Sequence, residues 1–288
     1  MFETMKTSVQ QMMIGPLCKS YSKTLEILKQ IKSFGYDAIE LNSFMIHKTP
    51  LIVRILTSLA GMPTGKSGKY DWPLLIKESG LEVSALHIDL DSLEKDSKKV
   101  VEEAKKFNTH FLVITGLYRF DYSNKEQVLS LAQRLNEMGK KIKEEGLELL
   151  YHNHNAEFNR IDNEITTYDL LVSNLNEEYV NFEFDSYWAS EAGVDIYSLM
   201  KKLGHRIKLH HINDRGFKKK GPYMTPIIKS DSMELGTGNL DIPKLLEIDD
   251  LNKCEYVTLE SHKNFIDKSR MKSIEMSGNY LNKIISNS

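Results

Sequence analysis

Short apolar runs alternate with helical patterns along almost the whole chain. The apolar runs typical of buried strands cover residues 8–15, 36–41, 81–87, 111–116, 147–150, 180–184, 207–210 and 256–259. Between them, apolar residues recur at three- and four-residue spacing, as the buried face of a helix requires. In 22–34, Leu25, Leu28 and Ile31 share such a face, and Gly35 follows where left-handed backbone ends a helix. The pattern predicts eight strands, each followed by a helix.

This order of elements favours one architecture. Strands that are apolar throughout and separated by helices are typical of a parallel sheet covered on its surface. Eight such units predict a closed (β/α)8 TIM barrel, an α/β fold. The other helices are expected at 74–79, after a cap at Ser92, and at 124–145, 168–175, 196–203, 243–248 and 268–285. No Gly/Ser/Pro-rich linker divides the chain, so residues 1–288 are predicted to form a single domain.

Two connections are longer than the others, at 42–71 and 214–240. Connections of this length in a compact fold usually cover a site or form an interface.

Composition narrows the class of protein. The chain has 41% hydrophobic and 27% charged residues and a net charge of −2, which does not favour binding to nucleic acid. It has no secretory apolar core at its start and no run of about 18 apolar residues that could span a membrane. Cys18 and Cys254 are far apart and lie in no motif, which favours a reducing interior. We therefore expect a cytoplasmic protein with no membrane partner.

Polar, titratable side chains gather where the predicted strands end. In a TIM barrel the active site lies at the carboxyl ends of the strands. Alternation places His152 and His154 on the same side of one strand end, so that they can converge on one ion or substrate. Alternation also turns only one of His210 and His211 inward, and we expect this to be His211. The strand ends supply seven such groups, at Glu40, His87, His152, His154, Asp185, His211 and Glu260.

Four motifs carry a family resemblance. They are Tyr151-His152-Asn153-His154 with Glu157-Phe158, Phe184-Asp185-Ser186-Tyr187-Trp188, His211-Ile212-Asn213-Asp214-Arg215, and Glu234-Leu235-Gly236-Thr237-Gly238. In this order and spacing the chain resembles the xylose isomerase-like TIM barrels of the sugar phosphate isomerase/epimerase superfamily, which also includes inosose dehydratases and endonuclease IV. The resemblance covers nearly the whole chain and does not specify a substrate.

The resemblance implies one divalent metal ion as the cofactor. Members bind it through a Glu, an Asp, a His and a second Glu at strand ends five to eight, and Asp185, His211 and Glu260 match the last three. Where many members have Glu-Asn-His, this chain has His152-Asn153-His154, so His152 either ligates through a ring nitrogen or leaves the ion more open. Mn²⁺, Co²⁺, Zn²⁺, Fe²⁺ and Mg²⁺ are all candidate ions, and the ligand types do not choose among them.

The implied reaction is removal of a proton from a carbon next to a carbonyl, through a metal-stabilised enediolate. Glu260 is the first candidate for one acid/base role, and His152 or Glu157 for the other. The leading hypothesis is a sugar or keto-sugar isomerase or epimerase. The alternative is a lyase, an inosose dehydratase-like enzyme that eliminates water from a keto-polyol or an oxidised glycoside. An endonuclease IV-like enzyme and a non-catalytic sugar-binding barrel are further alternatives.

Five residues are candidates for binding the substrate, a small sugar or sugar derivative. His87 either contacts a substrate hydroxyl group or is a rim histidine bound to the backbone, and Glu40 either holds the substrate or pairs with a nearby Lys. Trp188 either forms an apolar wall under a sugar ring or packs in the core, and His154 and Arg215 complete the set. Glu183 alternates with Asp185, and we expect it to lie below the ion in a supporting role. Members of the superfamily are often dimers or tetramers, so a homo-oligomer is possible for this chain.

Overall fold

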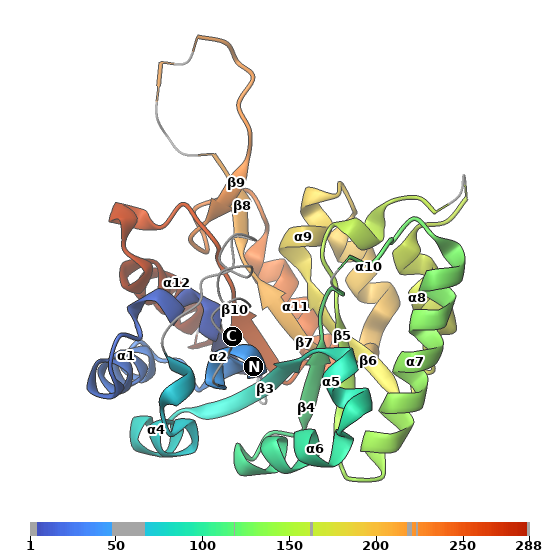
Figure 1. The fold of residues 1–288 in the computed structure, drawn as a ribbon. Coiled ribbons are helices and arrows are strands. Elements are labelled where there is room, and N and C mark those ends of the chain that lie inside the picture. The colour runs from blue at the N-terminus through green and yellow to red at the C-terminus, as the bar shows by residue number, and fades with distance from the viewer. Residues whose placement is uncertain are drawn as a thin grey trace.

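The computed structural model describes residues 5–47, 67–117, 119–161, 164–217, 221–222 and 224–286. Eight parallel strands close into a barrel in the order β1-β10-β7-β6-β5-β4-β3-β2 (Figure 1). The barrel strands are β1 (Lys6–Gln10), β2 (Ala38–Asn42), β3 (Glu82–Ile88), β4 (Phe111–Ile114), β5 (Glu148–His152), β6 (Val180–Asp185), β7 (Ile207–Ile212) and β10 (Tyr256–Leu259). This is the (β/α)8 barrel that the apolar pattern predicts.

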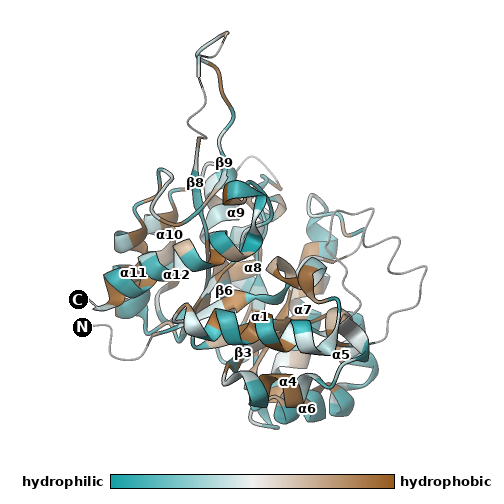
Figure 2. Ribbon diagram, turned by 90° about the vertical axis from the view of Figure 1, so that its left-hand side faces the viewer, coloured by the Kyte–Doolittle hydropathy of each residue, from teal (hydrophilic) through white to brown (hydrophobic). Residues whose placement is uncertain are grey.

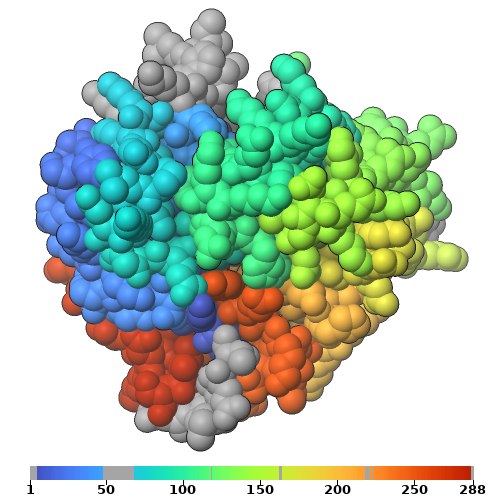
Figure 3. Space-filling model, turned by 90° about the horizontal axis from the view of Figure 1, so that it is seen from below, coloured from blue at the N-terminus to red at the C-terminus, as the bar shows by residue number. Residues whose placement is uncertain are grey.

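Helices connect consecutive strands on the outside of the barrel. They are α1 (Tyr21–Ser33), α2 (Ser43–Ile46), α4 (Trp72–Ser79), α5 (Leu90–Lys95), α6 (Ser97–Lys106), α7 (Lys125–Lys143), α8 (Thr167–Asn174), α9 (Ser186–Glu191), α10 (Ile196–Leu203), α11 (Ile242–Asn252) and α12 (Arg270–Ser286). Along α1 and α4 the hydropathy colours alternate, as expected for helices that bury one face (Figure 2). Seen from below, the chain colours run in order around the molecule, from blue through green to red (Figure 3).

The apolar core has two parts because alternate strand residues point to opposite faces of the barrel wall. The larger part fills the space between strands and helices and includes Leu149, Phe182 and Ile212. The smaller part comprises Ala38, Ala85, Phe111, Val113, Leu150, Leu209 and Tyr256, one set of alternating strand positions. We infer that this smaller part plugs the barrel interior below its carboxyl end, so that polar side chains of the same strands emerge above it.

The first strand is shorter than predicted. We expected residues 8–15, but β1 ends at Gln10, whose side chain accepts a hydrogen bond from the Met12 N–H. The chain then makes 3₁₀ turns at Gln11–Met13 and Gly15–Leu17. Apolar residues continue through these turns because they remain buried, so the apolar run does not mark the end of the strand.

The expected helix cap at Ser92 was wrong. Two helices, α5 and α6, occupy this stretch, and their caps are Asp89 and Asp96. The Asp89 carboxylate accepts a hydrogen bond from the Ser92 N–H, so Ser92 lies inside the first turn of α5. Asp is as good a cap as Ser, and the sequence offers both within three residues.

The two long connections have some structure of their own. In 214–240, β8 (Asp214–Gly216) and β9 (Asp231–Met233) pair as an antiparallel hairpin above the barrel (Figure 1). The Asp214 carboxylate organises this connection, because it accepts hydrogen bonds from the N–H groups of Gly236, Gly238 and Leu240. In 42–71, α2 and a 3₁₀ turn at Ser67–Lys69 are described, and residues 48–66 lie outside the described part. Within the described part of the chain, no helix is both long and apolar enough to cross a membrane.

Candidate functional site

Four titratable side chains meet at the carboxyl ends of β5, β6, β7 and the segment after β10. His152, Asp185, His211 and Glu260, called the strand-end group below, each offer a ligand atom within 4.8 Å of the others. Asp185 Oδ2 lies 4.0 Å from His152 Nε2 and 3.9 Å from His211 Nδ1. Glu260 Oε2 lies 3.1 Å from His211 Nδ1. All four residues are buried.

Strand register brings these residues side by side. Asp185 pairs with His211 across β6 and β7, and Glu260 directly follows the β10 pair of Ile212. Asn153 joins β5 to β6, because its side-chain amide donates to the Asp185 carbonyl and accepts from the Asp185 N–H. The Asp185 carboxylate also caps α9 by accepting a hydrogen bond of 2.8 Å from the Trp188 N–H. Backbone pairing therefore holds the group in place.

A second group of buried side chains shares His211 with the first. Glu40, His87, Glu183 and His211, called the inner group below, also place their ligand atoms within 4.8 Å of one another. Glu40 Oε1 lies 2.7 Å from both His87 Nε2 and His211 Nε2. Glu183 Oε2 lies 3.0 Å from His87 Nε2 and 3.3 Å from His211 Nε2. Both imidazoles of the strand-end group therefore have one nitrogen that faces this group and one that faces the inner group. The second nitrogen is Nδ1 in His152, 3.0 Å from Glu183, and Nε2 in His211, 2.7 Å from Glu40.

Burial and mutual charge shift the pKa values of these groups in opposite directions. Burial, reinforced by the charges of His211 and His87, holds the pKa of His152 well below its usual value. His87 loses solvation too, but the carboxylates of Glu40 and Glu183 outweigh that loss and raise its pKa to about 10. Burial and the neighbouring Glu40 raise the pKa of Glu183 to about 7. At neutral pH and without an ion, His152 is therefore neutral, the form that can ligate a metal, and His87 is charged.

The donor set of the strand-end group fits a divalent cation. Two imidazole nitrogens and two carboxylate oxygens converge, a combination that suits Mn²⁺, Co²⁺, Zn²⁺ or Fe²⁺. Buried carboxylates need a positive partner, because an unpaired buried charge costs several kcal/mol. Burial raises the pKa of Asp185 well above its usual value, since His211 offsets the lost solvation only in part and the Glu260 carboxylate adds to the rise. A cation among these four atoms would remove that cost.

A wall of rings lies beside the strand-end group. Trp188 lies between His154 and His262, with ring centroids 6.1 and 5.6 Å apart respectively, and His154 is 5.0 Å from His152. Burial lowers the pKa of His154 to about 3, so its ring is neutral. His262 Nε2 is 3.6 Å from Glu260 Oε2. Sequence reasoning missed His262, although its spacing of two from Glu260 is a signal that could have found it.

Other candidates lie farther from the strand-end group. The Glu157 carboxylate accepts hydrogen bonds from the Tyr151 hydroxyl and the His154 N–H, and belongs to neither group. It therefore supports the backbone of His154. Arg215 pairs with Glu191, so its guanidinium faces α9.

Glu40 and His87, for which substrate binding was one of two expectations, contact each other and the other members of the inner group. Glu40 is completely buried and His87 is 6% exposed. The sequence does not show how deep in the barrel each of these side chains ends.

The two adjacent histidines of β7 point in opposite directions, as alternation predicts. His211 lies in both groups, whereas His210 Nδ1 is 2.6 Å from Asp249 Oδ2 of α11, outside the barrel wall. Both members of this outer pair are completely buried.

A closed (β/α)8 barrel with buried titratable groups at the carboxyl ends of its strands is a TIM-barrel protein with a candidate active site. Comparison with known proteins identifies its family. Residues 28–275 match the model of the xylose isomerase-like TIM barrel family, and the chain belongs to that family. It is 29% identical over 149 residues to an inosose dehydratase of Clostridium perfringens, which covers 49% of each chain. The chain thus spans about half the length of the curated relatives that it matches, and these relatives are named enzymes.

Solved structures share the fold. A sugar phosphate isomerase/epimerase from Parabacteroides distasonis superposes with a TM-score of 0.74 at 18% identity, covering 96% of this chain and 93% of that one. A structure described as IolI protein with a binding zinc atom has a TM-score of 0.68 at 14% identity, covering 98% of both chains.

Proposed function

We propose that this protein is a divalent-metal-dependent enzyme that removes a proton from the carbon next to the carbonyl of a sugar or keto-sugar, and that it acts as an isomerase or epimerase. The observation that carries the proposal is the convergence of His152, Asp185, His211 and Glu260 at the end of the barrel where TIM-barrel active sites lie. These four residues would hold the ion. When bound, the ion would stabilise the negative charge that develops on the substrate's oxygen atoms as the proton leaves.

The protein's own residues supply the proton transfer. Glu260 is the proposed base: although burial opposes it, the charges of His262 and His211 hold the pKa of Glu260 well below its usual value. The carboxylate is therefore ionised and can accept a proton. Glu260, which gains a proton in this first step, is the proposed donor that returns it to the substrate, because His152 is neutral and a proposed ligand of the ion and so has no proton to give.

The ring wall would bind the substrate. Trp188, flanked by His154 and His262, offers an apolar face for the carbon–hydrogen side of a sugar ring, and the two imidazoles offer hydrogen bonds to its hydroxyl groups. Since Glu157 holds the His154 backbone through a hydrogen bond of 3.1 Å, we propose that it orients this wall and takes no part in proton transfer.

A lyase is the second candidate, favoured by the curated relatives, which are named inosose dehydratases. The first step is the same in both reactions. An isomerase or epimerase then returns a proton to carbon, whereas a dehydratase donates one to the departing β-hydroxyl.

The same proposal includes a cytoplasmic location, a single domain across residues 1–288 and assembly into a homo-oligomer.

One experiment separates these outcomes. The metal-loaded protein is incubated in D₂O with a panel of keto-hexoses, keto-inositols and 3-keto-glycosides, and the products are followed by NMR. Deuterium at the carbon next to the carbonyl, with water retained, supports an isomerase or epimerase, and loss of water supports the dehydratase. Glu260→Gln should slow either reaction by about 10²–10⁴-fold. Equal rates for Glu260→Gln and wild type would contradict the assigned base.

A further inference from the structure

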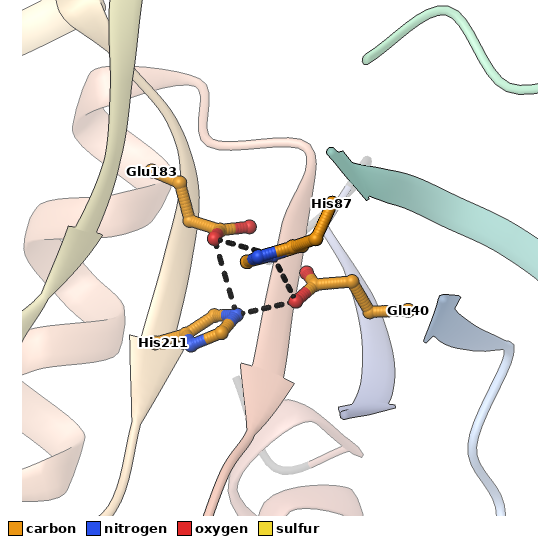
Figure 4. A group of neighbouring side chains, drawn as sticks. All are labelled: Glu40, His87, Glu183 and His211. Atoms are coloured by element: carbon orange, nitrogen blue, oxygen red, sulfur yellow. Dashed lines mark hydrogen bonds and ion pairs between the residues drawn. The ribbon is translucent and has the colours of Figure 1, made fainter. Parts of the chain in front are cut away.

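The inner group has the composition of a metal site in its own right. It contains two carboxylates and two imidazoles from β2, β3, β6 and β7, all facing one another inside the barrel (Figure 4). Its oxygen and nitrogen atoms alternate around a closed ring, with edges of 2.7, 3.0, 3.3 and 2.7 Å. Two carboxylate oxygens and two imidazole nitrogens, all within 4.8 Å of one another, are a donor set that can bind one divalent ion.

Hydrogen bonds do not account for this ring. Only the His211–Glu40 edge has hydrogen-bond geometry. His87 Nε2 and both carboxylate oxygens of Glu183 are buried and have no hydrogen-bond partner among the residues that the structure describes. Buried polar atoms without partners are rare in proteins and require an explanation, such as an ion. Two of these atoms, His87 Nε2 and Glu183 Oε2, belong to the ring and have only ion-pair contacts with its other members.

Charge leads to the same conclusion. The two groups together bury four carboxylates, those of Glu40, Glu183, Asp185 and Glu260. An unpaired buried carboxylate is costly. One divalent ion in the strand-end group offsets two of these charges, and a second divalent ion in the inner group would offset two more.

We propose that the inner group binds a second divalent cation through Glu40, His87, Glu183 and His211, and that His211 loses its ring N–H proton to solvent and links the two ions as an imidazolate through its two ring nitrogens. The inner site shares His211 with the strand-end group and in that respect rests on the proposed function. Four buried protein ligands and no open position are typical of a structural ion. Zn²⁺ and Co²⁺ fit such a mixed tetrahedral site, whereas Mg²⁺ requires octahedral oxygen ligands and keeps several waters.

The surroundings hold the inner ligands in place. Glu40 Oε2 accepts a hydrogen bond from the Thr258 hydroxyl, and Oε1 accepts one from the Gln10 amide, so the carboxylate is oriented toward the ring. The Gln10 side chain is itself held, because its oxygen accepts from the Asn42 amide. A carboxylate positioned by two donors needs little reorganisation to ligate an ion.

Metal counting tests the proposal. The purified full chain is loaded with Zn²⁺ or Co²⁺, dialysed, and analysed for metal per chain by elemental analysis, with circular dichroism to check folding. Wild type should hold two ions. Asp185→Asn/Glu260→Gln, which removes both carboxylates of the strand-end group, should hold one, and adding Glu40→Gln to that variant should leave none.

The matched control adds Asp249→Asn to the same double variant. Asp249 is a completely buried carboxylate paired with a histidine of the same strand β7, but it lies outside the barrel wall, so this variant should still hold one ion. One ion or none in wild type, or none in Asp185→Asn/Glu260→Gln, would overturn the inner site. Two ions that are both retained by Asp185→Asn/Glu260→Gln would leave the inner site standing and remove the ion from the proposed function.

Discussion

Asp185 is predicted to have two separable roles, as a metal ligand and as the cap of α9. Its Oδ2 atom faces His152 and His211, whereas Oδ1 accepts the 2.8 Å hydrogen bond from the Trp188 N–H. Asp185→Asn keeps an oxygen that can cap the helix but loses the charge that binds the cation. Asp185→Ala loses both. Comparison of these two variants therefore separates the cap from the ligand.

The size of each effect follows from the structure. Loss of a helix cap costs about 1 kcal/mol, so metal-free Asp185→Ala should unfold with a free energy about 1 kcal/mol lower than metal-free Asp185→Asn. In a chain of this size this corresponds to a melting temperature lower by about 2 °C. Metal-free Asp185→Asn should be at least as stable as wild type, because burial raises the pKa of Asp185 and the amide removes that buried charge. Both variants should bind a divalent ion at the strand-end group at least about 100-fold more weakly than wild type.

Urea denaturation with a chelator present measures the first difference, and metal titration measures the second. Equal stability of metal-free Asp185→Ala and Asp185→Asn would refute the cap. Wild-type ion affinity in Asp185→Asn would refute the ligand.

Three further predictions concern the rest of the barrel. Gly139→Ala should lower the free energy of unfolding by about 1–2 kcal/mol in urea titration, because a Cβ there would lie 2.3 Å from the Tyr179 carbonyl oxygen, and a gain in stability would contradict this packing. Neither cysteine of the native protein should react with a disulfide reagent at pH 8, since Cys18 and Cys254 are buried and burial raises the pKa of Cys18 to about 11. Both cysteines should react in the unfolded protein. The metal-free protein should lose stability as pH rises from 6.5 toward 10, because Glu40 and Glu183 raise the pKa of His87 to about 10 in the folded protein. The stabilisation by charged His87 is complete below pH 6.5 and disappears as the pH rises through 10. A melting temperature of the metal-free protein that stays constant over this range would contradict the His87 pairing.

The sequence predicts the barrel well because the strands are apolar throughout and Gly35, Gly80 and Gly146 separate helices from strands. All three glycines have positive φ, the backbone that ends a helix. The end of β1 was not predictable, since the chain stays buried through the turns that follow Gln10.

The strand-end residues were predictable because alternation and strand ends are local properties. The inner group was not, since it depends on how deep each side chain reaches into the barrel. Glu183 illustrates this difference. Alternation places it on the inner face, but only the closed barrel shows that its carboxylate contacts three histidines from three other strands. Glu157 shows the reverse, because its nearness in sequence to His152 does not bring its carboxylate into the group.

The most direct test of the central claim is the position of the ion in crystals of the protein loaded with Zn²⁺, located by anomalous scattering at the zinc edge. The account predicts a peak about 2.0–2.2 Å from His152 Nε2, Asp185 Oδ2, His211 Nδ1 and Glu260 Oε2. A loaded crystal without a peak among these four atoms would contradict it.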